Sequence, residues 1–295
     1  MGGKRAKRFR VRHAALGLGA LVLLLAGLTL GAQLYLRHRL DAAHLQRYLE
    51  AALTRQTHGL YHVRIGAARF SYLGRSFELA DFELYPDTAA FRREGAIRTV
   101  PRTRYHVRVG SLRFHGIPMW PVFGKQFVAA LTTLDSLRIE ISLDKTGSKN
   151  PASETHLPQE YLLGVRQPVR LNRLEIRHGY IRYSERAFDG ARFGTLPFAD
   201  LEAVVTNLSN GGRTGVLTGA VCQLDVRALL AGKGRLVAHF DYDLSSPKLN
   251  LAYRGSIARM DVRAFNSMLV DLQGMRVREG QLDTAWFAVL ERYTK

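Results

Sequence analysis

From residue 60 onward, the chain alternates repeatedly between apolar and polar residues with a period of two. This pattern is typical of β-strands with one buried face. The clearest run is 234–246, in which apolar residues occupy every second position and the positions between them are mixed. The apolar residues are Leu236, Ala238, Phe240, Tyr242 and Leu244. Similar runs occupy 61–70, 76–86, 105–114, 137–144, 171–185, 198–210, 215–230 and 249–260. Short connections between the later runs predict antiparallel strands.

Two of the runs nearly repeat each other, with YHVRIGAARF beginning at Tyr61 and YHVRVGSLRF at Tyr105. In each copy a glycine, Gly66 or Gly110, shifts the parity of the alternation so that the following phenylalanine faces the other way. Such a shift indicates a β-bulge or a bend. Between the copies, 76–86 predicts a strand pair or one bent strand, and 86–104 a polar connection.

Helical spacing is found at both ends of this β-rich region. Residues 40–58 carry Leu45, Tyr48, Leu49, Ala52 and Leu53 on one face and stop at Gly59. Because the polar face is mixed, we expect this helix to cover the sheet rather than lie along a membrane. Near the other end, a helix capped by Asp261 and ended by Gly274 presents Val262, Phe265, Leu269 and Leu272. We also expect a short helix within 120–134 and a strand pair hinged at Gly280.

The longest apolar run, residues 14–36, contains 23 residues without a charge, enough to span a bilayer as a helix. Only basic residues carry charge before it: Lys4, Arg5, Lys7, Arg8, Arg10 and Arg12. By the positive-inside rule, the N-terminus is predicted to be cytoplasmic and the body translocated. A cleaved signal peptide is the alternative, but its apolar stretch is shorter and ends in small residues. Within the run, Gly27 and Gly31 form a small-xxx-small pair that is a weak signal for helix packing.

The chain is therefore predicted to have five parts. These are a cytoplasmic basic segment (1–13), a transmembrane helix (14–36), a first β-rich portion with its leading helix (37–143), a linker (144–160) and a second β-rich portion (161–295). The linker is inferred from its Gly, Ser, Asn, Thr and Pro content. The predicted fold class is mainly β with a few helices.

The formal charge of +18 does not indicate nucleic-acid binding once it is divided along the chain. Six basic residues precede the apolar run, and the remaining 37 basic and 25 acidic residues leave an excess of 12 spread thinly over the body. No compact basic stripe or recognition motif accompanies it. Anionic lipid head groups are a more plausible partner for a translocated basic body, although charge alone fixes none.

Candidate chemistry is sparse. The sequence lacks a nucleophile elbow, an HExxH motif, paired cysteines, a phosphate loop and a dinucleotide fingerprint. His62 and His106 occupy matching positions in the near-repeat, and His239 shares a strand face with Asp241 and Asp243; solvated positions are favoured over a metal or acid–base site. We therefore predict neither an enzyme nor a bound cofactor or metal. The single cysteine, Cys222, is expected to be a buried strand residue rather than a reactive thiol.

Several longer phrases resemble AsmA-like envelope proteins, relatives of TamB and of bridge-like lipid-transfer proteins. They are FELADFELYPD, LNRLEIRHGYIRYSE followed by LPFADLEAVVTNLS, and YRGSIARMDVRAFNSMLVDLQGMRVREGQLD. The last phrase carries the most specific positions in the expected order: Gly255, Met260, Asp261, Asn266, Gly274, Gly280, Gln281, Leu282 and Asp283. The likeness covers most of residues 14–285. Members of this family usually continue through more strands, so the resemblance also implies a shortened form.

The resemblance implies a curved, largely antiparallel sheet, shaped like a groove or taco, in which lipid acyl chains lie between the inner and outer membranes. It places the body in the periplasm. The apolar residues of the second portion are then groove candidates: Leu174, Ile176, Ile181, Tyr183, Leu236, Ala238, Phe240, Tyr242, Leu251 and Tyr253. An open edge at the last strand would suit pairing with an envelope protein.

The leading hypothesis from sequence is a non-enzymatic protein anchored in the inner membrane that binds or passes lipid or supports outer-membrane assembly. The alternative is a periplasmic scaffold with a filled core that recruits other envelope proteins. A hydrolase remains a third hypothesis without a supporting motif.

Overall fold

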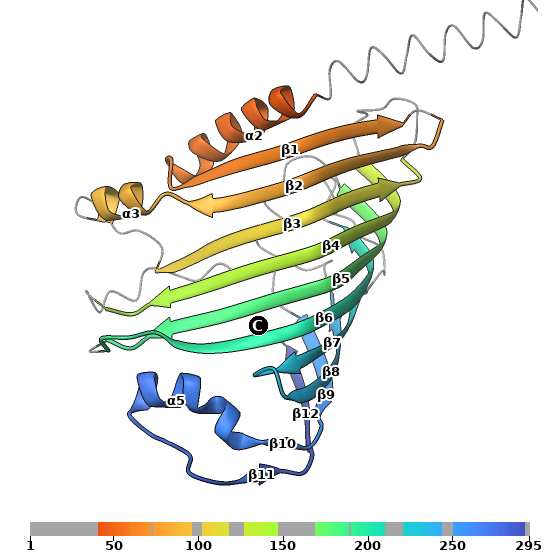
Figure 1. Ribbon diagram of the computed structural model, residues 1–295. Helices are drawn as coiled ribbons and strands as arrows, with labels where there is room; N and C mark the ends of the chain where they lie inside the picture. The colour runs from red at the N-terminus through yellow and green to blue at the C-terminus, as the bar shows by residue number, and fades with distance from the viewer. Residues whose placement is uncertain are drawn as a thin grey trace, which may run out of the picture.

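The computed structural model describes residues 41–71, 73–95, 102–117, 127–146, 169–188, 190–209, 221–243 and 250–292. Within them the protein is mainly β, with one sheet of ten strands and a second sheet of two (Figure 1). The strands of the large sheet are β1 (Tyr61–Ser71), β2 (Ser76–Pro86), β3 (Thr103–His115), β4 (Phe127–Asp144), β5 (Val169–Arg186), β6 (Gly194–Ser209), β7 (Cys222–Leu230), β8 (Gly234–Tyr242), β9 (Asn250–Ile257) and β12 (Ala285–Arg292). β10 (Met260–Asp261) pairs with β11 (Gln281–Leu282).

The ten strands follow one another in space in the order of the sequence, from β1 to β9 and then β12. Neighbouring strands are antiparallel except β4 and β5, which are parallel and lie on either side of the predicted linker. The sheet is therefore mixed, and it runs continuously across that linker. The short-connection rule that predicts antiparallel neighbours does not reach this pair, because the residues between β4 and β5 are numerous enough for the chain to return to the same side.

The alternation of side chains shifts by one residue along a line that crosses β1 to β6. In β1, Val63 and Ile65 share a face with Ala68, and in β2, Leu79 shares a face with Phe82. The residues at the shift are Gly66, Asp81, Gly110, Ser136, His178 and Asp200, of which the four non-glycine residues have positive φ angles between 47° and 56°. Because all six strands shift at the same line, apolar residues stay on one side of the sheet along the whole length of each strand.

The parity shifts predicted at Gly66 and Gly110 are thus confirmed, and they return the following phenylalanine to the apolar side. A side chain at Gly66 has no room, because its Cβ would lie 2.9 Å from the Cβ of Asp81. Figure 1 shows that the sheet also curls, with β1–β5 toward the viewer and β7–β12 turning behind them. β1 and β12 are the two outermost of the described strands and do not pair with each other.

Three α-helices accompany the sheet within the described residues. α2 (Ala42–Thr57) packs on β1 through Leu45, Leu49 and Leu53, as predicted, although Tyr48 is 70% exposed and does not belong to its packed face. α3 (Thr88–Gly95) lies where the sequence predicts only a polar connection. α5 (Asn266–Gln273) follows a short 3-10 helix, η2 (Val262–Phe265), whose first turn is capped by the carboxylate of Asp261 as predicted.

Two local predictions are wrong. The short helix expected within 120–134 is excluded over 127–134, because β4 begins at Phe127 and pairs with β3 and β5 on both sides; 120–126 lies outside the described residues. The hairpin expected around Gly280 is not formed either. β11 pairs with β10 and β12 pairs with β9, so the two segments flanking Thr284 belong to different sheets. In both places tertiary pairing overrides the local pattern.

Several predicted features lie outside the described residues. These are the basic segment 1–13, the membrane helix 14–36 with Gly27 and Gly31, and most of the linker 144–160. Among the helices that the structure describes, none has the length and apolar character needed to cross a bilayer.

We expect the packing of α5 to depend on Gly194 at the start of β6. A Cβ at this position would lie 2.6 Å from the backbone oxygen of Met268, so Gly194→Ala should displace α5 and lower the free energy of unfolding by about 1–3 kcal/mol. Urea denaturation measures this loss. Gly110→Ala is the matched control, because its nearest contact is a side chain, the Cβ of Ser136 at 3.1 Å. An equal loss of stability in both variants would contradict a specific role of Gly194 in the packing of α5.

Candidate functional site

All ten predicted groove residues lie on one side of the large sheet. Directly paired residues of neighbouring strands point to the same side. The pairs Leu174 with Val205, Val205 with Leu224, Leu224 with Phe240, and Phe240 with Tyr253 therefore join the two halves of the prediction. We call this side the apolar face; it also carries the packed residues of β1–β4 described above. The opposite side is called the polar face.

The apolar face is only partly shielded from solvent. Of the ten predicted residues, Ala238 is buried and the other nine are half-buried. The described helices that pack closely on the sheet are α2, on β1, and α5, on β5 and β6. Over β7, β8, β9 and β12, no described helix forms a second layer of comparable contact. A sheet with one apolar face normally buries it against such a layer, so this part of the face is the candidate site.

Aromatic side chains form a ladder on this part of the apolar face. Tyr242 and Phe240 stack with ring centroids 6.1 Å apart, Phe240 stacks on Tyr253 at 5.5 Å, and Tyr253 is tilted against Phe287 at 6.1 Å. Phe287 was missed by the sequence reasoning because the strand that carries it was assigned to a hairpin. The ladder gives the face a broad, flat apolar surface with few rotatable bonds.

Other residues of the apolar face also escaped the sequence prediction, although they follow the same alternation. A cluster in the middle of the sheet is formed by Leu201, Ala203 and Ala228, with Ile176, Ile181, Phe198, Leu224 and Val226 packed against it. The period-two pattern of β6 and β7 carried the signal for them. The pattern did not reveal the shift in alternation at Asp200. That shift sets which residues of β6 lie on the apolar face before and after it.

Two tyrosines of the apolar face stay uncharged near neutral pH. Burial raises the pKa of Tyr242, and the buried Cys222 thiol beside it adds to that rise. Burial likewise raises the pKa of the Tyr183 hydroxyl, which donates a hydrogen bond to Glu185. Both hydroxyls are therefore uncharged near neutral pH, and the charge beside Tyr183 belongs to Glu185, which is paired with Lys145 at 2.5 Å.

The edge of β1 is closed by side chains of α2. The backbone N–H of Val63 donates to the Oε2 of Glu50 at 2.8 Å, and that of Ile65 donates to the Oε1 of Gln46 at 3.1 Å. These donors lie on the side of β1 away from β2, where they have no partner strand. A polar contact of this kind protects an edge strand from pairing with another chain.

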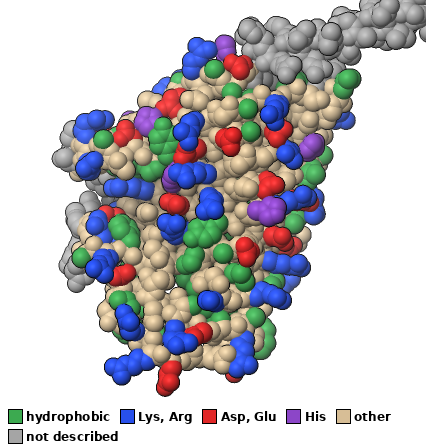
Figure 2. Space-filling view, viewed as in Figure 1, with side chains coloured by type: hydrophobic (Ala, Val, Ile, Leu, Met, Phe, Trp, Pro, Cys, Tyr) green, Lys and Arg blue, Asp and Glu red, His purple; other side chains and the backbone are tan. Residues whose placement is uncertain are grey.

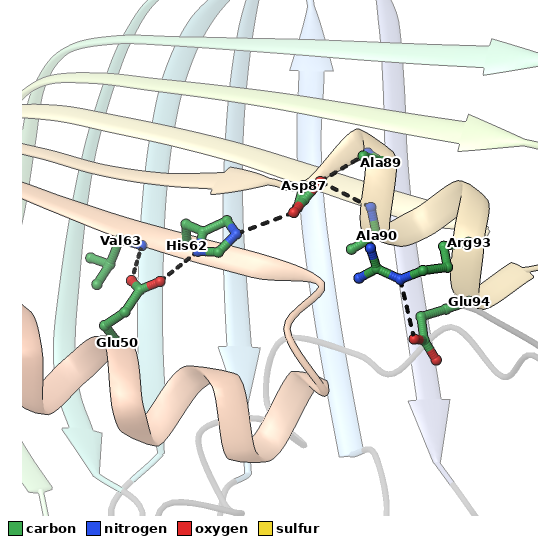
Figure 3. A network of polar contacts seen from close by, with 8 residues as sticks. All are labelled: Glu50, His62, Val63, Asp87, Ala89, Ala90, Arg93 and Glu94. Carbon is green, nitrogen blue, oxygen red and sulfur yellow. Dashed lines mark hydrogen bonds and ion pairs between the residues drawn. The ribbon is translucent and has the colours of Figure 1, made fainter.

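His62 links α2, β1 and the beginning of α3 (Figure 3). Its Nδ1 lies 2.5 Å from Glu50, and its Nε2 lies 3.4 Å from Asp87, whose carboxylate also accepts from the N–H groups of Ala89 and Ala90. The hydrogen bond with Glu50 raises the pKa of His62; partial burial opposes the rise and Asp87 adds to it. The predicted alternative of a metal shared with His106 is not supported, because β2 separates the two strands.

The other histidines singled out by the sequence are held by carboxylates on the polar face. His106 contacts Glu83 at 2.8 Å, and His239 contacts Asp225 at 2.7 Å and Asp241 at 3.2 Å. Asp225 was missed because it comes from the neighbouring strand β7. Within the described residues no group of three or more His, Cys, Asp or Glu side chains has the geometry of a metal site.

Comparison with known proteins adds no relative. No family model matches the chain, and no curated protein matches it.

We expect the His62 bridge to stabilise the protein at low pH and not at high pH. Because its folded pKa is raised above 6.5, its contribution is complete below that value and is lost as the pH rises through the folded pKa. About a third of the side chain is exposed, so we expect His62→Gln to cost only about 0.2–1 kcal/mol near pH 5. Denaturation of both proteins near pH 5 and near pH 9 measures the difference.

Glu50→Gln provides a second test of the bridge, since it keeps an acceptor for Val63 N–H and removes the charge opposite His62. Its loss of stability should follow the same pH course. A loss that is equal at both pH values in both variants would contradict a charged bridge.

We expect the Cys222 thiol to be inert in the folded protein. The residue is 3% exposed, and burial raises the pKa of its thiol to about 11 from 9.0, which leaves about 100-fold less thiolate. A chromogenic disulfide reagent at neutral pH should label it slowly in buffer and completely in denaturant. Rapid labelling in buffer would contradict its burial.

Proposed function

We propose that the apolar face of the sheet binds the acyl chains of lipid and that the protein works without catalysis. The single observation that carries this proposal is that, among the described residues, no helix forms a comparable second layer on the apolar face over β7, β8, β9 and β12. Each methylene of an acyl chain that leaves water contributes about 0.8 kcal/mol, so a long chain laid along the aromatic ladder would be held firmly. The resemblance to AsmA-like proteins points to the same ligand.

The chemistry of the face fits a lipid chain better than a polar substrate. Phe240, Tyr253 and Phe287 present ring faces and edges, and Tyr183 and Tyr242 stay neutral at physiological pH. A charged small molecule would find no counter-ion on the ladder. The curl of the sheet also supports the proposal, because in Figures 1 and 2 the charged side of β1–β5 is turned outward and the apolar face lies on the inside of the curve.

We further propose that the protein is anchored in the inner membrane of a bacterium with its body in the periplasm. The predicted membrane helix ends at residue 36, only a few residues before α2 begins at Ala42. An anchor at that point would hold the sheet beside a bilayer, which is a source of lipid. Passage of lipid between membranes and support of outer-membrane assembly both follow from such a position.

The competing function is a scaffold whose apolar face is filled by protein, and photo-crosslinking separates the two. A benzophenone side chain at Phe240 or Tyr242, in the full chain expressed in cells, should capture phospholipid if the face binds acyl chains. The matched control is the same group at Arg113, which points out from the polar face of β3 and is paired with Glu78. We expect lipid adducts at the first two positions and none at the third.

Adducts only with protein at Phe240 and Tyr242 would support the scaffold and overturn lipid binding. A second measurement, native mass spectrometry of the purified full chain, should show co-purified phospholipid that is lost when the ladder is interrupted by Phe240→Asp. Absence of lipid in the unmodified chain would also overturn the proposal.

A further inference from the structure

The polar face of the sheet has two regions that differ in how their charges are satisfied. Over β1–β5, basic side chains are paired across strands with Glu78, Glu83 and Glu140, and Glu175 pairs with Arg173 and Arg177 of its own strand. Figure 2 shows this region, with basic and acidic side chains intermingled. Hydrogen bonds with these basic partners, and with His106 in the case of Glu83, lower the pKa of Glu78, Glu83 and Glu175, so the pairs are charged over the physiological range.

The second region lies over β7, β8, β9 and β12, on the reverse side of the aromatic ladder. Its residues form rows of cross-strand neighbours. One row runs Arg227, Val237, Ser256, Trp286, the next Asp225, His239, Arg254, Ala288, and the third Gln223, Asp241, Ala252, Leu290. We define the outer patch as five residues of these rows together with Arg235, which lies beside them on β8. Its members are Arg227, Arg235, Val237, Arg254, Trp286 and Leu290.

The apolar members of the outer patch are unusually exposed. Trp286 is 79% exposed, Leu290 63% and Val237 41%. A shallow depression of about 600 Å³ is lined by Trp286 and Val237 together with the small residues Gly255, Ser256 and Ala288. Together with the depression, these exposed apolar side chains mark this side of the strands as a candidate contact surface.

The basic members of the outer patch lack the partners found elsewhere on this face. Among the described residues, no carboxylate forms an ion pair with Arg227, Arg235 or Arg254, and all three are exposed. Glu202 is the direct cross-strand neighbour of Arg227 but forms no ion pair with it, and Asp225 and Asp241 are both engaged by His239. The hydrogen bond with Asp225 raises the pKa of His239, and Asp241 supports the rise.

We propose that the outer patch docks on the surface of a bilayer that contains anionic lipid. Tryptophan prefers the level of the lipid head groups, and arginine reaches phosphate groups while its stem stays on apolar surface. The two large side chains of β12 are separated by Ala288, roughly 14 Å apart along the strand. At this spacing the two side chains act as separate anchors. They do not form the packed apolar centre that is typical of a protein–protein interface. The site is independent of the lipid-binding face, which lies on the other side of the same strands.

The two tryptophans of the chain make this docking measurable. Trp120→Phe leaves Trp286 as the only tryptophan of the full chain, which is then held in nanodiscs of neutral phosphatidylcholine. Added vesicles of brominated phosphatidylglycerol should quench and blue-shift the emission of Trp286, and added salt should reverse the effect. Vesicles of brominated phosphatidylcholine should quench it far less.

Arg254→Gln should weaken vesicle binding about fivefold, which corresponds to about 1 kcal/mol for each basic residue near an anionic surface. Arg113→Gln is the matched control, because this arginine lies on the same polar face in an ion pair with Glu78, and we expect binding to be unchanged. Leu290→Ser, which keeps all charges, should weaken binding without altering its dependence on salt.

Three results would overturn the proposal. The first is the absence of quenching by the anionic vesicles. The second is equal quenching by anionic and neutral vesicles. The third is quenching that persists after the vesicles are removed by centrifugation and is unaffected by Arg254→Gln. Such quenching would come from lipid that the protein has extracted onto its apolar face. Thermal unfolding of each variant serves as the folding control, because the substituted side chains are exposed.

Discussion

The architecture depends on one constraint, which is that ten strands keep their apolar side chains on the same side of a single sheet. A slip of one residue in any strand would turn its apolar set to the opposite side. The strands are long enough that this constraint must survive a bend. It does so because β1 to β6 all shift phase at one line, where residues such as Asp81 and Ser136 adopt positive φ angles and the neighbouring glycines allow close approach. The apolar face is continuous only because these shifts coincide.

The two outermost described strands are treated differently. The free N–H groups of β1 are taken up by Gln46 and Glu50, and the same glutamate meets His62, so covering the edge and fixing α2 are one interaction. β12 presents an exposed indole and leucine on one side and Phe287 on the other. The sheet thus has a covered end near the predicted membrane helix and, at its far end, strands whose two sides both present apolar groups. The proposed lipid-binding face and the proposed docking patch are the two sides of those strands.

The distribution of charge follows from the same arrangement. Basic residues that alternate with apolar ones must gather on the polar face. Over β1–β5 several of them pair with a carboxylate, as Arg108 does with Glu83 of the neighbouring strand and Arg173 with Glu175 of its own strand. This explains why a body with a large basic excess shows no basic stripe there. Where Asp225 and Asp241 are instead held by His239, no described carboxylate pairs with Arg227, Arg235 or Arg254. A difference in local pairing thus becomes a difference in what the surface can bind.

The period-two pattern was enough to predict most of the strands and to place the ten groove candidates on one side of the sheet, although not Phe287, because alternation with one buried face is a local property. The sequence by itself also determined α2 and the cap at Asp261, whose signals lie within a few residues. It did not determine the parallel pairing of β4 with β5, the start of β4 at Phe127, α3, or the separate partners of β11 and β12. Those depend on which strand lies alongside, and that is decided by contacts between residues far apart in the chain. The partners of His62 and His239 depend on tertiary structure for the same reason, since Glu50 and Asp225 reach them from other elements.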